Sequence, residues 1–186
     1  METKERLKEI PEFPSADSHK PLLLVDIDGV ISLFGGEPGS RGEGSLHSID
    51  GILHFLSSAA AAHLLDLQEQ FELAWCSGWE EKADEHLPHL LGLPRGLPFL
   101  RFERSVGRAN AHWKLEAIDA FAGERALAWI DDALSPACHE WAAAREAGGS
   151  PTLLVTTEPQ LGLTAREAAL LSGWAGELQR RRAAAS

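Results

Sequence analysis

Two aspartates follow a short apolar run near the start of the chain. Residues 21–25 read Pro-Leu-Leu-Leu-Val, and Asp26-Ile27-Asp28-Gly29 come next. Such a run is typical of a strand buried on both faces of a parallel sheet, where carboxylates are costly unless something uses or neutralises them. If the strand stays extended, Asp26 and Asp28 point to the same side at the sheet edge where ligands bind and chemistry would occur. Asp28-Gly29 alone could be a simple turn, but a turn does not explain Asp26.

Three later positions place further polar groups at predicted strand ends or helix starts. Ser77 and Gly78 follow another apolar run, and a hydroxyl beside a glycine amide ahead of a helix can bind an anion. Lys114 falls in the first turn of a predicted helix, where a cation opposes the helix dipole. Asp131 and Asp132 end a further apolar run, and paired carboxylates suit a hard cation such as Mg²⁺. Taken one at a time, Ser77-Gly78 could be a turn and Lys114 a solvated surface residue.

These residues must be positioned by the elements around them, and apolar runs and helical patterns alternate along the chain. The predicted strands are residues 22–28, 73–77, 98–102, 126–131 and 152–157. The predicted helices are residues 53–70, 79–91, 112–122, 136–147 and a last helix after Thr164, where Glu167 completes a capping box. This alternation predicts an α/β fold, a three-layer Rossmann-like sandwich with a central parallel sheet.

The segment between the acid pair and the first predicted helix breaks the alternation. Residues 33–48 are rich in glycine and come soon after Asp28, so they could form a flap over the site, or a surface loop without function. Residues 1–20 are charged and contain Pro11 and Pro14, and we expect them to form a flexible tail. Residues 21–186 are then expected to form a single domain that includes this flap.

The composition narrows the possible partners and compartments. The 186 residues carry a net charge of −11, which argues against bulk binding of nucleic acid by the whole surface but leaves a local basic site open. No apolar stretch is long enough to cross a bilayer, and the N-terminus lacks the apolar segment of a secretory signal. With only two cysteines, Cys76 and Cys138, a reduced protein of the cytoplasm is expected.

The order of the polar motifs resembles that of the haloacid dehalogenase-like (HAD) superfamily of phosphatases and phosphotransferases. Residues 26–30 are similar to its first motif, Ser77 to the second, Lys114 to the third and residues 131–132 to the fourth. The resemblance covers about residues 22–157, with each motif at a strand end or the following helix start. Receiver domains use similar residues, but their acidic pair is on the first strand and their lysine comes last, which is not the order found here.

A closer resemblance extends to the C-terminal helix. Residues 78–81 (GWEE), 90–94 (LLGLP), 128–132 (AWIDD) and 162–164 (GLT) look like those of a small bacterial group of such domains, related to ones found in RNA-repair proteins. This group would share the HAD-like fold without a large cap domain, because the gaps between the motifs leave no room for one.

The superfamily resemblance implies a role for each residue of the site. Asp26 would be the nucleophile that forms an aspartyl-phosphate, and Asp28 would protonate the leaving oxygen and then activate water. Ser77 and the Gly78 amide would bind phosphate oxygens, and Lys114 would neutralise charge on Asp26 and on the phosphoryl group. The acid at position 28 is the mark of the phosphatases and phosphotransferases within the superfamily.

The resemblance also implies a magnesium site. Mg²⁺ would be held by Asp26, the backbone carbonyl of Asp28, and Asp131, and it would offset repulsion between the nucleophile and the phosphate dianion. Asp132 would orient a metal-bound water or Lys114.

The expected activity is therefore a Mg²⁺-dependent phosphohydrolase, and alternatives stay open. A site without a large cap could serve a small phosphate ester, or it could admit a phosphorylated nucleic-acid end in a repair system. A different class of function is a non-catalytic binding or partner domain that keeps the fold. The intact set of Asp26, Asp28, Ser77, Lys114 and Asp131 counts against that class.

Overall fold

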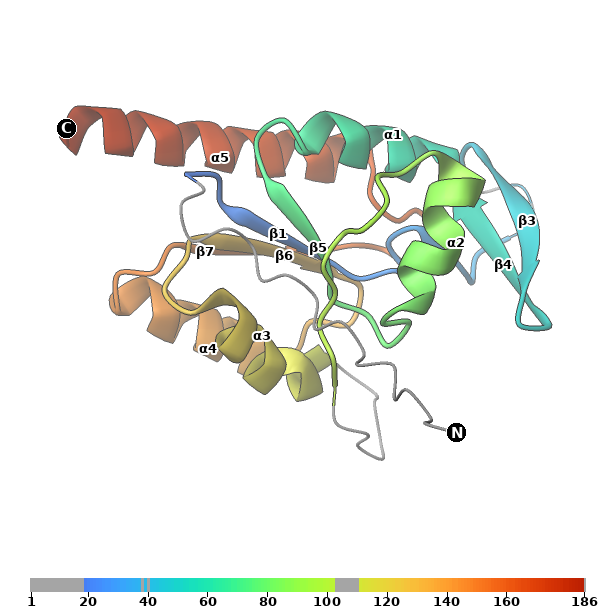
Figure 1. Cartoon of the computed structure of the whole chain (residues 1–186), viewed down its shortest axis with the longest axis horizontal. Coiled ribbons are helices and arrows are strands. Elements are labelled where there is room, and N and C mark those ends of the chain that lie inside the picture. The colour runs from blue at the N-terminus through green and yellow to red at the C-terminus, as the bar shows by residue number, and fades with distance from the viewer. Residues whose placement is uncertain (1–18, 38, 40, 103–110, 186) are drawn as a thin grey trace, which may run out of the picture.

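Four parallel strands form the centre of the molecule. The computed structural model describes residues 19–37, 39, 41–102 and 111–185 (Figure 1). The central sheet consists of β1 (Leu22–Val25), β5 (Glu72–Trp75), β6 (Leu127–Asp131) and β7 (Thr152–Thr156), in the order β5-β1-β6-β7. Val25 lies opposite Trp75 and Ile130, so the residues that follow β1 and β5 meet the end of β6 at one edge of the sheet.

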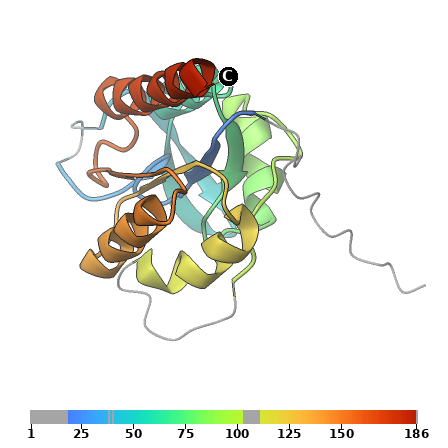
Figure 2. The same cartoon turned by 90° about the vertical axis from the view of Figure 1, so that its left-hand side faces the viewer.

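Helices cover both faces of this sheet, which confirms the predicted α/β sandwich with a central parallel sheet (Figure 2). Helices α1 (Ser58–Leu67) and α5 (Ala165–Ala185) lie on one face, and α3 (Leu115–Ala122) and α4 (Pro136–Ala147) lie on the other. Alternate residues of β1 supply the two cores: Leu23 and Val25 pack with α1 and α5, whereas Leu22 and Leu24 pack with α3 and α4. This alternation is why the whole of β1 reads as apolar.

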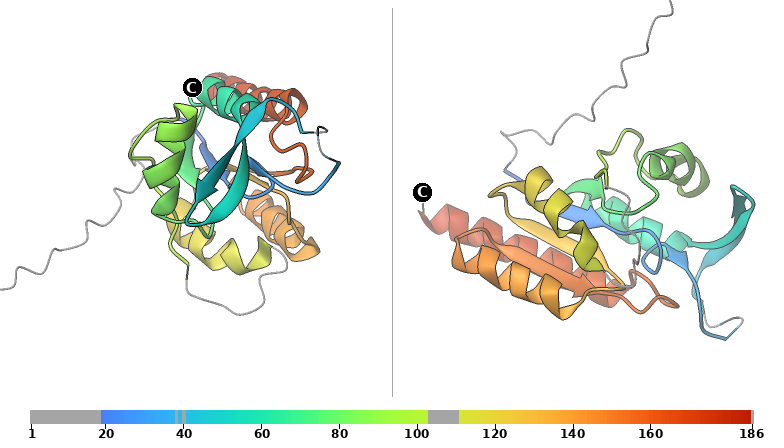
Figure 3. Two further views of the ribbon diagram at one scale, coloured as in Figure 1. Left: turned by 90° about the vertical axis from the view of Figure 1, so that its right-hand side faces the viewer. Right: turned by 90° about the horizontal axis from the view of Figure 1, so that it is seen from below.

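A second, antiparallel sheet projects from one end of the molecule (Figure 3). It consists of β2 (Ser32–Leu33), β3 (Gly44–Ile49) and β4 (Ile52–Ser57), in the order β2-β4-β3. The predicted helix over residues 53–70 is therefore wrong in its first part. The helix begins only at Ser58, where the Ser57 hydroxyl accepts a hydrogen bond from the Ala60 amide at 3.1 Å.

The turn between β3 and β4 explains this difference. Asp50 and Gly51 both have positive φ, 51° and 80°, as the two central residues of a type I′ hairpin turn require. The β3–β4 hairpin occupies part of the segment that we expected to be a glycine-rich flap or loop, residues 33–48. Residues 38 and 40 of that segment lie outside the described part of the chain.

Two other predicted elements differ in their bounds or type. The predicted strand over residues 98–102 forms only an isolated parallel bridge between Phe99 and Trp75 at the edge of β5. The helix predicted over residues 79–91 begins later, as α2 (Lys82–Leu91), because Glu80 has a φ of 47° that a right-handed helix excludes.

The remaining elements agree closely with the prediction. The region predicted as a helix over residues 112–122 consists of a 3₁₀ turn, η1 (Ala111–Lys114), followed directly by α3. Helix α4 has the predicted bounds. Helix α5 starts after Thr164, whose amide donates to the Glu167 carboxylate at 3.1 Å, in the manner of a capping box.

The predicted tail, residues 1–20, falls almost entirely outside the described residues. Lys20, which is described, donates from Nζ to the Gln68 carbonyl at 3.1 Å. Among the described helices, none combines the length and the apolar character needed to cross a bilayer.

Candidate active site

The chain turns sharply where β1 ends, three residues earlier than predicted. The Ile27 carbonyl accepts hydrogen bonds from the Val30, Ile31 and Ser32 amides at 3.2, 2.8 and 2.9 Å. Asp26 is consequently buried, with 7% of its surface exposed, whereas the Asp28 side chain is 51% exposed. The expectation that an extended strand continues through Asp28 is wrong, because this turn interrupts it.

A pocket of about 210 Å³ nevertheless brings the two acids together at the carboxyl edge of the sheet. It is lined by residues from four separate parts of the chain, which are Asp26, Asp28, Ser77, Gly78, Ala111, Trp113, Lys114, Asp131, Asp132 and Ala133. All of the predicted site residues are among them. We call this the inner pocket.

Lys114 lies at the base of the inner pocket, between two aspartates. Its Nζ is 3.0 Å from Asp26 Oδ2 and 2.6 Å from Asp131 Oδ2, and it donates to the Cys76 carbonyl at 2.8 Å. Lys114 is only 3% exposed, and Asp131 is fully buried. It is not a solvated surface lysine, and its place just before α3 is explained by the buried carboxylates that it neutralises.

The balance of charge and burial shifts the protonation of this cluster. Burial and the neighbouring Asp131 raise the pKa of Asp26 to about 7, even though Lys114 acts in the opposite direction. Burial alone would lower the pKa of Lys114, but the negative charges of Asp26 and Asp131 outweigh it and hold that pKa above its usual range. Lys114 therefore stays a cation, while Asp26 can gain or lose a proton near neutral pH.

Three carboxylates of the inner pocket are close enough to share a metal ion. One oxygen from each of Asp26, Asp131 and Asp132 lies within 4.8 Å of the others. An all-oxygen, anionic donor set of this kind fits a hard cation such as Mg²⁺. The structure thus places Asp132 beside Asp26 and Asp131, as a third carboxylate rather than only a residue behind them. The assignment of the Asp28 carbonyl as a ligand stays a prediction.

Gly29 makes room for Asp132. Its φ is +75°, and a Cβ built on it would lie 2.4 Å from Asp132 Cγ. The Gly29 carbonyl accepts a hydrogen bond from the Thr157 hydroxyl at 2.8 Å, which fixes the turn after β1 to the end of β7. Burial and the charge of Asp131 raise the pKa of Asp132. Gly29 is therefore needed for its conformation and for its small size.

Ser77 and Gly78 line the inner pocket, although not at the start of a helix. Ser77 is 2% exposed, and its carbonyl accepts from the Glu80 amide at 3.1 Å, which closes a turn before α2. The Ser77 hydroxyl lies 3.5 Å from the Trp79 amide. Because α2 begins at Lys82, the expected contribution of its N-terminus at Gly78 is absent from the described geometry.

Two residues that sequence analysis left out of the site contact Asp28. The Trp79 indole Nε1–H donates to Asp28 Oδ2 at 3.0 Å, and His54 Nδ1 lies 4.0 Å from Asp28 Oδ1. The rings of His54 and Trp79 meet edge to face with 4.9 Å between their centres, and Ser32 Oγ is 2.9 Å from His54 Nδ1. Sequence alone does not assign His54 to the site, because a lone histidine is more often a surface or packing residue than a functional one. Sequence alone does not assign Trp79 to the site either, because a tryptophan near such motifs is more often a packing residue of the core or rim.

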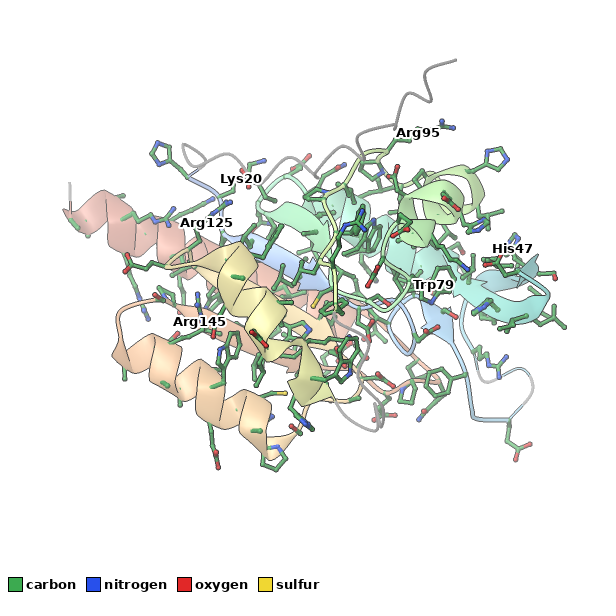
Figure 4. The ribbon with its side chains drawn as sticks, turned by 60° about the horizontal axis from the view of Figure 1, so that its bottom comes forward. Lys20, His47, Trp79, Arg95, Arg125 and Arg145 are labelled. Carbon is green, nitrogen blue, oxygen red and sulfur yellow. The ribbon has the colours of Figure 1, made fainter. Side chains whose placement is uncertain are left out.

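A second and wider pocket, of about 520 Å³, adjoins the first. It lies between the β3–β4 hairpin and the start of α2, with Trp79 between these two elements (Figure 4). Its lining consists of Asp28, Ile49, Asp50, Ile52, His54, Gly78, Trp79, Glu80, Glu81 and Lys82. We call it the outer pocket. Asp28 and Gly78 line both pockets and mark the junction between them.

Comparison with protein families and with curated proteins does not identify this site. Neither a scan against protein-family models nor a search of the curated proteins finds a match for the chain. A Rossmann-like α/β fold is compatible with many unrelated activities, so fold alone does not determine function.

Proposed function

We propose that this protein is a Mg²⁺-dependent phosphohydrolase of the HAD-like type, with Asp26 as the nucleophile. The observation that carries the proposal is the position of Asp26: a buried carboxylate 3.0 Å from the Lys114 ammonium, in a pocket that Asp28 and Ser77 also line. A buried carboxylate held beside a cation and open to a pocket suits attack on an electrophile that carries negative charge.

Each residue of the inner pocket has a separate role in the proposed reaction. Asp26 attacks phosphorus, forming a bond from its carboxylate oxygen while the bond to the leaving oxygen breaks. Asp28, half exposed at the mouth of the inner pocket, gives its proton to that oxygen and then takes one from the water that hydrolyses the aspartyl-phosphate. Lys114 and the Ser77 hydroxyl bind phosphoryl oxygens, and Lys114 balances the charge of Asp26.

The carboxylates of Asp26 and Asp131 would hold Mg²⁺, together with the Asp28 carbonyl, and Asp132 lies close enough to contact the ion or a water bound to it. When bound, the ion supplies positive charge that reduces repulsion between the nucleophile and the phosphate dianion. The Ala133 amide donates to Asp131 Oδ1 at 2.9 Å, and this bond orients that carboxylate.

The same proposal includes a reducing compartment, the cytoplasm. Cys76 and Cys138 are both buried and neither forms a disulfide. Burial raises the pKa of the Cys76 thiol far above its usual range, so it stays protonated beside the site. Cys76 therefore does not compete with Asp26 as a nucleophile.

A screen of phosphate esters with and without Mg²⁺ tests the proposal. It includes small esters and oligonucleotides with a terminal phosphate, and it is run on wild type and Asp26→Asn. We expect phosphate release that needs Mg²⁺ and that falls by about three orders of magnitude or more in a folded Asp26→Asn protein. Equal rates in both proteins would remove Asp26 as the nucleophile. No release from any ester would favour the non-catalytic partner domain.

A further inference from the structure

The junction of the two pockets divides any substrate of this site into two parts. If the phosphoryl group is bound in the inner pocket, as the proposed function requires, its leaving oxygen must face Asp28, the proton donor. Asp28 also lines the outer pocket, where Trp79 Nε1–H holds its Oδ2 at 3.0 Å. The alcohol that leaves with that oxygen therefore extends into the outer pocket.

The outer pocket has the size and the walls of a small-molecule site. Its volume of about 520 Å³ lies within the range of about 300–1,000 Å³ that is common for such sites. Ile49, Ile52 and Trp79 give it apolar and aromatic walls. Lys82 of α2 and Asp50 of the hairpin turn, which also line the pocket, form an ion pair with each other.

The charges that line the outer pocket are mainly negative. Among the described residues of its lining, four are carboxylates and one is a lysine. The lysine, Lys82, is already paired with Asp50, and Glu80 accepts from the Phe102 amide at 3.1 Å. His54 is held near Ser32. Glu81 forms no hydrogen bond or ion pair among the described contacts. Its charge acts on Lys82, which is already paired with Asp50, so the rim keeps an excess of negative charge.

We propose that the substrate is a small monophosphate ester whose alcohol carries no negative charge, with a further preference for an alcohol that carries a positive one. An anionic alcohol would place its charge beside the carboxylates of Glu80 and Glu81. A nucleic-acid end is excluded by the same argument, because the phosphates that follow the terminal one would lie in or across this pocket. The substrate assignment rests on the proposed function.

Esters that share the phosphoryl group and differ in the charge of the alcohol test this proposal. The set consists of phosphocholine and phosphoethanolamine, glycerol monophosphate, phosphoglycolate, and an oligonucleotide with a terminal phosphate. We expect kcat/KM to fall from the cationic esters to the neutral one and then to the anionic ones. Each step should be about fivefold, the size of one exposed interaction between the charge of the alcohol and a carboxylate of the pocket. Glu81→Gln should narrow this preference. Glu140→Gln removes the same charge from α4, on the opposite face of the central sheet and outside the pocket lining, and should leave the preference unchanged.

The possible results separate the two proposals. Faster turnover of phosphoglycolate or of the oligonucleotide would overturn the substrate assignment while leaving the phosphohydrolase in place. A preference that Glu81→Gln and Glu140→Gln change equally would show that overall charge, not the outer pocket, selects the substrate, and would also overturn the assignment. Absence of turnover with every ester would overturn the proposed function and the substrate assignment with it.

Discussion

Two clusters of lysine and aspartate in this molecule use the same chemical groups and differ in burial. In the inner pocket, Lys114 lies among Asp26 and Asp131, and all three are almost removed from solvent. Beside the outer pocket, Lys82 pairs with Asp50, and more than half of each side chain is exposed. Water screens the exposed pair, whereas in the buried cluster burial competes with attraction.

The pKa of each aspartate reflects this difference. Asp50 has a lowered pKa because it is hydrogen-bonded to Lys82, as expected for an exposed ion pair. Burial and Asp131 instead raise the pKa of Asp26 to about 7, despite its own lysine. Burying a carboxylate costs free energy, whereas an exposed ion pair changes the stability little. A carboxylate that is buried despite this cost is typical of a functional site.

Replacement of the buried lysine should have the largest effect. Lys114→Met leaves two buried aspartates without their cation, and we expect the free energy of unfolding without added metal to fall by about 3–5 kcal/mol. Urea unfolding measures it. Lys82→Met, the matched change in the exposed pair, should leave the urea midpoint almost unchanged. Equal losses in the two variants would contradict the contrast between the clusters.

A methyl group at Gly29 should disturb the inner pocket through Asp132. Gly29→Ala forces a positive φ on alanine and places a Cβ against the Asp132 carboxylate, which together should cost about 2–4 kcal/mol. Gly35→Ala is the control, because Gly35 has a similar φ of +71° and no atom within 4 Å of a built Cβ. It should cost only about 1 kcal/mol. Urea unfolding that shows no difference between the two would mean that Asp132 moves freely.

The raised pKa of Asp26 predicts a stability gain when the nucleophile is removed. Between about pH 4, the ordinary pKa of an aspartate, and pH 7, the folded protein keeps a proton that the unfolded chain has lost. This carboxyl therefore lowers the free energy of unfolding as the pH rises through that window, and its effect is constant above it.

Asp26→Asn should consequently unfold later than wild type above pH 7 in the absence of metal, by about 1–3 kcal/mol. The difference should shrink as the pH falls toward about 4. Thermal or urea unfolding across this range measures it. Asp50→Asn, which removes an exposed aspartate of lowered pKa, should show no such gain. A variant less stable than wild type at high pH would reverse the sign and contradict the account.

The smallest expected effect concerns the residue that links the two pockets. Trp79→Phe keeps an aromatic ring and loses the N–H that donates to Asp28, so we expect kcat to fall about tenfold while KM changes little. Trp141→Phe removes a similar hydrogen bond to Asp119, far along the chain from the site, and should leave kcat unchanged. A change in KM alone would mean that Trp79 binds substrate without positioning the proton donor.

The two regions also differ in how well sequence predicts them. Asp26, Ser77, Lys114 and Asp131 could be found because each lies at the end of a predicted strand or the start of a predicted helix, and an α/β fold brings such positions to one edge of the sheet. The geometry of Asp28 could not, since it depends on the turn that three amides make with the Ile27 carbonyl. Burial of Lys114 likewise follows from its tertiary neighbours, not from its place in the chain.

The outer pocket was missed for a local reason. Residues 53–57 run directly into the alanine-rich start of α1, and this continuity favoured one long helix. The Asp50-Gly51 pair is a hairpin signal in the sequence, yet the order of apolar residues around it does not alternate cleanly. The bridge between Phe99 and Trp75 is likewise a tertiary contact, too short to form the predicted strand.

The most direct measurement of the central claim is the mass of a trapped phosphoenzyme. The Asp28→Asn protein is incubated with Mg²⁺ and acetyl phosphate, a donor whose leaving group needs no protonation. The masses of the intact protein and of its peptides are then measured by mass spectrometry. The account predicts that one phosphoryl group accumulates on Asp26, and that the double variant Asp26→Asn, Asp28→Asn carries none. If wild type consumes the donor while Asp26 stays unmodified in Asp28→Asn, or if the label lies on another residue, Asp26 is not the nucleophile.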